Sequence, residues 1–131
     1  MLKELGSKHA LVVHGTGGLD ELSTIGPTKI SELAGGKITA YYVKPEDYGF
    51  RAAKPEQIRG DDADSNARIT REILAGSKGP KRDIVLLNAG AAIYVGGRAK
   101  TIKEGIKAAE KSIDSGKAMA ALEKLVEVSN A

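Results

Sequence analysis

The chain has no cysteine and no tryptophan, and it has only one phenylalanine and four tyrosines among its 131 residues. Without cysteine it forms neither disulfides nor thiolate metal sites. So few aromatic side chains do not make a base-stacking surface, which argues against a nucleic-acid partner. The formal net charge of +3 and the pI of about 9.1 allow anionic ligands but do not by themselves indicate nucleic acid.

Long hydrophobic runs are also missing. No apolar stretch approaches the roughly 20 residues that cross a bilayer, and the mixed residues Leu2, Lys3, Glu4 and Leu5 do not resemble a secretory signal. We therefore expect no membrane partner and a cytoplasmic location. Hydrophobic residues make up 41% of the chain and charged residues 28%, as in an ordinary globular domain with a hydrophobic core.

Three strands are predicted in the first third of the chain. Residues 9–14 are apolar without clear alternation, which is typical of a strand covered on both faces of an α/β sheet. Residues 28–34 and 37–43 flank Gly35-Gly36, a two-residue hairpin signal. The sequence therefore predicts one strand followed by an antiparallel hairpin.

Four helices are predicted after the hairpin, and together with the strands they indicate an α/β layer architecture. Residues 45–49 are expected to form a turn or a single helical turn, and residues 50–60 to be irregular. The helices are expected over residues 62–74, 81–95, from the N-cap Thr101 to Gly116, and 118–128. The last two are expected to bury Ile102, Ile106, Ala109 and Ile113, and Met119, Leu122, Leu125 and Val126, respectively.

The acidic loop, residues 14–23, combines glycines with two adjacent carboxylates. Gly15-Thr-Gly-Gly18 follows the first strand, at the end where open α/β sheets place their ligands, and lets the backbone turn tightly. Asp20 and Glu21 then supply the oxygen ligands that Mg²⁺ prefers, either for two ions or for one ion bound directly and through water. The alternative is that the two acids cap a following helix. The loop is neither a dinucleotide fingerprint nor a Walker loop, since the glycine spacing is wrong.

Other polar residues have a structural explanation beside a functional one. His14 ends the first strand and could contact a ligand, whereas His9 is interpreted as structural. Four lysines recur at helical spacing, at 100, 103, 107 and 111. They are interpreted as a solvated helix face that could also contact phosphates. Gly90, Ala91 and Ala92 are interpreted as helix-packing residues, and the acids Asp61, Asp62 and Asp64 as helix-capping residues.

Several segments closely resemble anthranilate phosphoribosyltransferases. The similarity is carried by Val12-Val-His-Gly, Gly18-Leu-Asp-Glu-Leu-Ser23, Pro45-Glu-Asp-Tyr-Gly49, Asn88-Ala-Gly-Ala-Ala-Ile-Tyr-Val95, Ile113-Asp-Ser-Gly-Lys-Ala118 and Leu122-Glu-Lys-Leu125. The resemblance implies a partial three-layer α/β domain of the phosphoribosyltransferase and nucleoside-phosphorylase type. It also implies phosphoribosyl transfer from 5-phosphoribosyl diphosphate to anthranilate, in tryptophan biosynthesis, with Asp20 and Glu21 holding the Mg²⁺ that neutralises the leaving diphosphate.

The chain also departs from the family pattern. The family's N-terminal helical domain, its earlier diphosphate-binding Gly-Thr-Gly-Gly-Asp loop and its Lys-His-Gly-Asn-Arg segment have no counterpart in it. Residues 1–131 are therefore interpreted as the C-terminal portion of the α/β domain, to which no catalytic or substrate-binding residue is assigned. We expect the chain to be inactive alone, to need the missing N-terminal portion, and to self-associate through exposed apolar surface. The alternatives are a pyrimidine nucleoside phosphorylase-like enzyme and a non-catalytic, nucleic-acid-binding relative.

Overall fold

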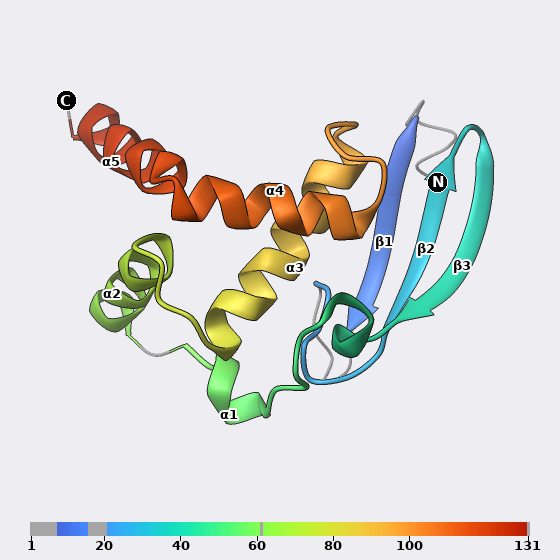
Figure 1. The fold of residues 1–131 in the computed structure, drawn as a ribbon, viewed down its shortest axis with the longest axis horizontal. Helices are drawn as coiled ribbons and strands as arrows, with labels where there is room; N and C mark the ends of the chain where they lie inside the picture. The colour runs from blue at the N-terminus through green and yellow to red at the C-terminus, as the bar shows by residue number, and fades with distance from the viewer. Residues whose placement is uncertain (1–7, 16–20, 61, 131) are drawn as a thin grey trace.

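The computed structural model describes residues 8–15, 21–60 and 62–130 (Figure 1). Three strands lie at one end of an elongated molecule and α2 and α5 at the other, with α3 and α4 between them. The elements are β1 (His9–Gly15), β2 (Thr28–Ala34), β3 (Lys37–Val43), the 3-10 helix η1 (Pro45–Tyr48), α1 (Pro55–Ile58), α2 (Ala63–Leu74), α3 (Pro80–Val95), α4 (Ile102–Asp114) and α5 (Lys117–Ser129). The mixed α/β class and the three predicted strands are confirmed.

The sheet is antiparallel throughout, in the order β1-β2-β3. Gly35 and Gly36 join β2 to β3 with φ of +58° and +77°, values that glycine adopts without strain. The expectation that the first strand is covered on both faces is wrong for the described residues. Side chains alternate between the two faces of a strand. Ile30 faces the core and is fully buried, while Val12 on the opposite face is 58% exposed.

Two helices begin at the capping residues that the sequence predicted. Asp62 caps α2 by accepting a hydrogen bond from Ser65 N at 2.7 Å, as predicted. Thr101 caps α4 in the same way, accepting from Glu104 N at 3.1 Å. The expectation that residues 50–60 are irregular is wrong, because α1 forms there and raises the number of helices in the described parts of the chain to five. Its first residue is a proline, and the side chain at its third position accepts a hydrogen bond from Lys54 N at 2.8 Å.

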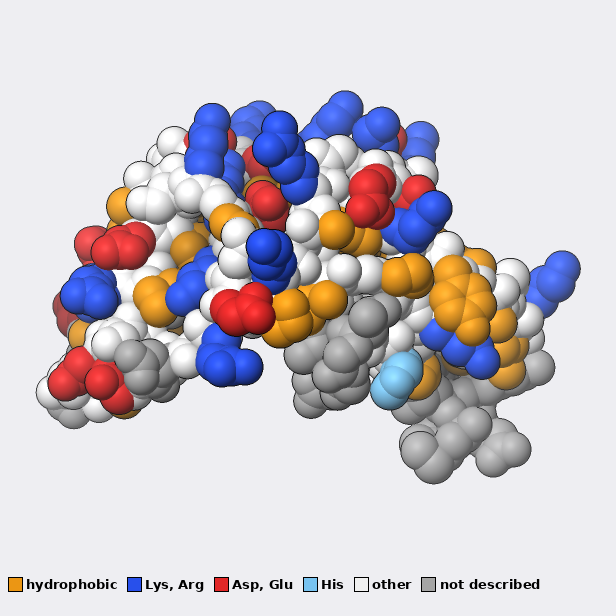
Figure 2. Space-filling view, turned by 90° about the horizontal axis from the view of Figure 1, so that it is seen from below, with side chains coloured by type: hydrophobic (Ala, Val, Ile, Leu, Met, Phe, Trp, Pro, Cys, Tyr) orange, Lys and Arg blue, Asp and Glu red, His pale blue; other side chains and the backbone are white. Residues whose placement is uncertain are grey.

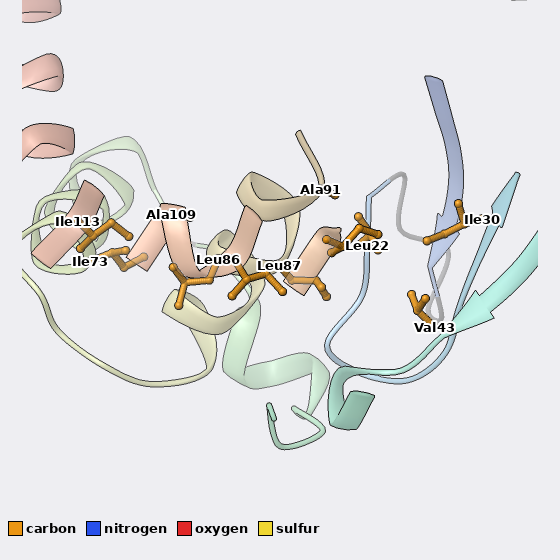
Figure 3. Close-up of a cluster of buried hydrophobic side chains, with 11 residues drawn as sticks. Leu22, Ile30, Val43, Ile73, Leu86, Leu87, Ala91, Ala109 and Ile113 are labelled. Carbon is orange, nitrogen blue, oxygen red and sulfur yellow. The ribbon is translucent and has the colours of Figure 1, made fainter. Parts of the chain in front are cut away.

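The hydrophobic core runs between the sheet and the two central helices (Figure 3). It joins Ile30 and Val43 of the sheet to Leu86 and Leu87 of α3. The four residues predicted to be buried on α4 lie in it: Ile102, Ile106, Ala109 and Ile113. The core therefore connects the sheet to helices that lie far along the chain.

A pair of glycines lets α3 and α4 cross at backbone contact. A Cβ atom added to Gly90 would lie 2.6 Å from Ile106 N, and one added to Gly105 would lie 2.9 Å from the carbonyl carbon of Gly90. Both distances are shorter than real Cβ contacts, so neither position has room for a methyl group. The packing interpretation is confirmed for Gly90 and the buried Ala91, but is wrong for Ala92, which is exposed.

The predicted burial of α5 is wrong. None of its residues is buried, and Leu125 and Val126 are 62% and 39% exposed. An apolar stripe is buried only where another element lies against it. Within residues 8–15, 21–60 and 62–130, α2 and α4 contact α5, where Met119 and Leu122 are half-buried, but they leave Leu125 and Val126 exposed. No helix in that part of the chain combines the length and the apolar character of a membrane span.

Candidate functional site

The acidic loop connects two antiparallel neighbours, β1 and β2. Asp20 and the glycines at 17 and 18 lie outside the described residues, whereas Glu21 is described and its side chain is exposed. The helix-capping explanation is wrong for Glu21, because no helix forms between this residue and Thr28, where β2 begins. Its carboxylate therefore has no capping role and faces solvent.

The residue after Glu21 is held by a side chain from α3. Asn88 Oδ1 accepts a hydrogen bond from Leu22 N at 2.8 Å, and Asn88 Nδ2 donates to Leu22 O at 2.9 Å. The same Nδ2 donates to Ile84 O, one turn earlier on α3, at 3.0 Å. Leu22 itself is 3% exposed and belongs to the core. The peptide groups on both sides of Leu22 are thus fixed to the helix.

Further hydrogen bonds fix the segment that follows, residues 22–25, which we call the loop stem. Ser23 N donates to Thr28 Oγ1 at 2.9 Å, and Ile25 N donates to Ser23 Oγ at 3.0 Å. Thr24 O accepts from Ala53 N at 2.7 Å. Ser23, Thr24 and Thr28 are all buried. The stem is therefore tied to α3, to β2 and to the segment before α1, and Glu21 projects from a rigid base.

The described residues fit Mg²⁺ as an ion shared with a substrate. Glu21 offers an exposed carboxylate, a hard oxygen ligand. No group of three or more His, Cys, Asp or Glu side chains that could hold a metal occurs in the described parts of the chain. Mg²⁺ in proteins is commonly bound by one or two carboxylates and completes its octahedron with water and phosphate oxygens. The Glu21 carboxylate could therefore be one ligand of such an ion, with water and phosphate oxygens as the others.

The predicted histidines differ in their surroundings. His14 is exposed near the end of β1, where contact with a ligand stays a prediction. His9 Nε2 lies 2.8 Å from Glu32 Oε2, and its ring packs edge-on against Tyr94, with centroids 4.8 Å apart. Tyr41 donates its hydroxyl to Glu32 Oε1 at 2.5 Å, and Tyr94 donates its own to Glu32 Oε2. We call His9, Glu32, Tyr41 and Tyr94 the Glu32 cluster; its contacts make His9 structural, as predicted.

Hydrogen bonding sets the charge states in the Glu32 cluster. Desolvation by burial would raise the pKa of Glu32. The donors Tyr41, Tyr94 and His9 outweigh it and hold the pKa of this carboxyl below its ordinary value. The hydrogen bond to Glu32, followed by burial, raises the pKa of Tyr94 to about 12. Burial, followed by the same carboxylate, raises the pKa of Tyr41. The cluster is therefore one carboxylate held by neutral phenols at neutral pH.

The other charged candidates are accounted for by solvation and capping. The lysines at 100, 103, 107 and 111 are all exposed, as expected for a solvated helix face. Lys and Arg side chains crowd one edge of the view in Figure 2. Asp62 caps α2, Asp64 lies in its first turn, and Asp61 falls outside the described residues.

Two site-building residues were missed by the sequence reasoning. Asn88 interrupts an otherwise apolar stretch of α3, and a polar residue on a packed helix face needs hydrogen-bond partners. Glu32 is similarly an acid on the core-facing side of a strand. Leu22 lies 66 residues from Asn88 in sequence and Tyr94 lies 62 residues from Glu32, so no local pattern identifies these long-range partners.

A family match assigns this α/β chain to a class of glycosyl-transferring domains. Residues 1–119 match the family described as "Glycosyl transferase family, a/b domain", and the chain belongs to that family. Within it, the chain is 50% identical over 129 residues to an anthranilate phosphoribosyltransferase from Rubrobacter xylanophilus. That alignment covers 98% of this chain and 38% of the relative.

Solved structures agree with this assignment. The crystal structure of anthranilate phosphoribosyltransferase from Thermus thermophilus superposes with a TM-score of 0.88 at 38% identity, over 99% of this chain and 38% of that one. The Saccharomyces cerevisiae enzyme, in complex with PRPP and Mg, superposes with a TM-score of 0.82 at 29% identity, over 94% and 36%. The described fold is thus part of a phosphoribosyltransferase-type α/β domain, and the chain spans about 38% of the length of these relatives.

Proposed function

We propose that this chain provides the Mg²⁺-binding part of an anthranilate phosphoribosyltransferase, which transfers phosphoribosyl from 5-phosphoribosyl diphosphate to anthranilate in tryptophan biosynthesis. The observation that carries the proposal is the exposed Glu21 carboxylate on a rigid loop stem, in a chain 50% identical to a named enzyme of that activity. This similarity favours the transferase over the pyrimidine nucleoside phosphorylase-like and nucleic-acid-binding alternatives.

Asp20 and Glu21 are the residues proposed to hold Mg²⁺. A yeast relative is described in complex with PRPP and Mg, which supports the pairing of this ion with a diphosphate substrate. When bound, Mg²⁺ neutralises negative charge that develops on the leaving diphosphate. The chain's own contribution is to keep Glu21 in place through the loop stem, so that little rearrangement is needed when the substrate arrives.

The chain is proposed to act as the C-terminal portion of the α/β domain, together with further residues that the relatives carry. The apolar face of the sheet opposite Ile30 supports this arrangement, because Val12, Ile38 and Tyr42 are 58%, 63% and 69% exposed. A sheet that is hydrophobic on both faces is stable when both faces are covered. We accordingly propose that the 131-residue chain alone is inactive, and that its cellular location is the cytoplasm.

A chimera tests the proposed activity. Residues 1–131 would replace the matching segment of the Rubrobacter xylanophilus relative, and the loss of anthranilate fluorescence would be followed with 5-phosphoribosyl diphosphate and Mg²⁺. The isolated chain is measured beside it. We expect magnesium-dependent turnover by the chimera and none by the isolated chain.

Two results would contradict the proposal. A chimera that folds, as judged by circular dichroism, but does not consume anthranilate would contradict the activity. Robust turnover by the isolated chain would contradict the division of the domain.

A further inference from the structure

We infer that Asn88 is a positioning residue for the acidic loop: its amide fixes both peptide groups of Leu22 and thereby sets the place of the Glu21 carboxylate. This inference rests on the proposed function, because it assigns a task to a residue outside the predicted metal ligands. Asn88 itself does not touch the reacting atoms.

The geometry is reciprocal. The amide oxygen accepts from Leu22 N at 2.8 Å, and the amide nitrogen donates to Leu22 O at 2.9 Å. Two antiparallel hydrogen bonds to one residue fix both its position and its orientation, as a partner strand does in a sheet. The N–H group of Leu22 belongs to the peptide that begins at the carbonyl of Glu21. The Glu21 Cα atom therefore lies in a peptide plane that is held by α3.

The Asn88 side chain is itself held in one orientation. Its nitrogen also donates to Ile84 O at 3.0 Å, so the donor end faces two carbonyls and the acceptor end faces one N–H. Rotating the amide by 180° would place its oxygen against two acceptors, which identifies the nitrogen and oxygen of the amide. Neither an apolar side chain nor a carboxylate supplies this combination of donor and acceptor.

The anchoring helix is among the most constrained parts of the molecule. Leu86 and Leu87, next to Asn88 on α3, are 2% and 1% exposed, and Gly90 meets α4 at backbone contact. The hydrogen bonds that tie the loop stem to β2 and to the segment before α1 are made by residues 23 and 24. Leu22 thus connects Glu21 to α3, and Asn88 is the side chain that makes this connection.

The consequence is specific to the loop. Without the Asn88 amide, Leu22 loses both hydrogen bonds, while the bonds of Ser23 and Thr24 remain. The stem stays folded, and Glu21 samples a wider range of positions. Partners that orient metal ligands from outside the coordination sphere are commonly worth about 10- to 100-fold in metal affinity. We therefore expect about 10-fold for an interaction that acts through the backbone.

The test uses the chimera described above, with 5-phosphoribosyl diphosphate to complete the ligand set and Mn²⁺ as a paramagnetic substitute for Mg²⁺. Asn88→Ala and Asn88→Leu both remove the amide, and leucine keeps the side-chain volume in case alanine impairs folding. Ile113→Val on α4 is the matched control, because it loses stability in the core without touching the loop. Amide hydrogen exchange at Leu22 and the Mn²⁺-induced broadening of signals from residues 21–25 are measured by NMR.

We expect faster exchange of the Leu22 amide and an approximately 10-fold higher Mn²⁺ dissociation constant in both Asn88 variants, with neither change in Ile113→Val. Unchanged Leu22 exchange, or an unchanged dissociation constant, in the Asn88 variants would overturn the inference while leaving the metal site intact. Absence of Mn²⁺ broadening in the unsubstituted chimera with 5-phosphoribosyl diphosphate would instead overturn the proposed metal role, and the positioning role with it.

Discussion

Tyr94, near the end of α3, donates its hydroxyl to the carboxylate of Glu32 on β2, across 62 residues of sequence. This contact joins the sheet to the central helix at a point where both side chains are half-buried. Hydrogen bonds to a charged partner commonly contribute about 1.5–3 kcal/mol to stability. The Glu32 cluster therefore connects the sheet to α3 through polar contacts, in addition to the hydrophobic core.

Tyr94→Phe should therefore destabilise the chain while leaving its packing largely unchanged. We expect the free energy of unfolding to fall by about 1.5–3 kcal/mol, measured by urea denaturation. Tyr42→Phe is the matched control, because Tyr42 lies on the opposite face of the sheet and is 69% exposed. Equal decreases in the free energy of unfolding in the two variants would show that the hydrogen bond from Tyr94 to Glu32 does not stabilise the chain.

The Glu32 cluster should also give stability an acid limit. The pKa of Glu32 is lower in the folded chain than its ordinary value of 4.5. Its contribution to the free energy of unfolding is therefore complete above about pH 4.5 and is lost as the pH falls through the folded-state pKa. We expect the stability advantage of wild type over Glu32→Gln to shrink between about pH 5 and pH 3 in urea titrations. An advantage independent of pH over that interval would contradict the assigned charge state.

Gly90→Ala should be one of the most damaging single changes in the chain. The added methyl group would press against the backbone of Ile106, so α3 and α4 must separate or shift. Overpacking of this kind costs about 1–3 kcal/mol, and more where backbone must move. Gly96→Ala, at the end of the same helix, is the control, since its nearest contact would lie at 3.3 Å and its φ of −72° suits alanine. Comparable melting temperatures for the two variants would contradict the close crossing.

The exposed face of the sheet should make the chain self-associate. We expect the sedimentation coefficient to rise with concentration, because Val12, Ile38 and Tyr42 form an uncovered apolar surface. Ile38→Lys should lower this dependence, since a charge within the apolar surface opposes its burial against another chain. Thr39→Lys is the control, because the next side chain along β3 points to the other face. Identical sedimentation of both variants and wild type would argue against this surface.

Local patterns predicted the local parts of the fold. The hairpin at Gly35-Gly36, the cap of Asp62 and the cap of Thr101 depend on neighbouring residues, and the structure confirms all three. The errors concern what covers an apolar surface. The sequences of β1 and α5 show apolar residues, but they do not show which element lies against them, so Val12 and Leu125 were expected to be buried and are not.

The candidate site likewise combines residues proposed from local sequence with contacts that depend on long-range packing. Asp20 and Glu21 are proposed from their residue type and from their position after a strand. The hydrogen bonds that organise the loop were not predicted, since Asn88 meets Leu22 only once α3 has packed against the sheet. The helix-capping alternative is wrong for Glu21 for a related reason: the element that follows this residue is β2, whose pairing with β3 decides its conformation.

The central claim is that the Glu21 carboxylate serves catalysis by holding Mg²⁺, and magnesium-dependent kinetics of the chimera test it most directly. Glu21→Gln is compared with Glu46→Gln, an exposed glutamate in η1. We expect Glu21→Gln to lower kcat/KM for 5-phosphoribosyl diphosphate by about 100-fold, as for other losses of charge stabilisation at a leaving group. Excess Mg²⁺ should partly restore it, and Glu46→Gln should have little effect. A Glu21→Gln chimera with the wild-type rate and the wild-type magnesium dependence would contradict the account.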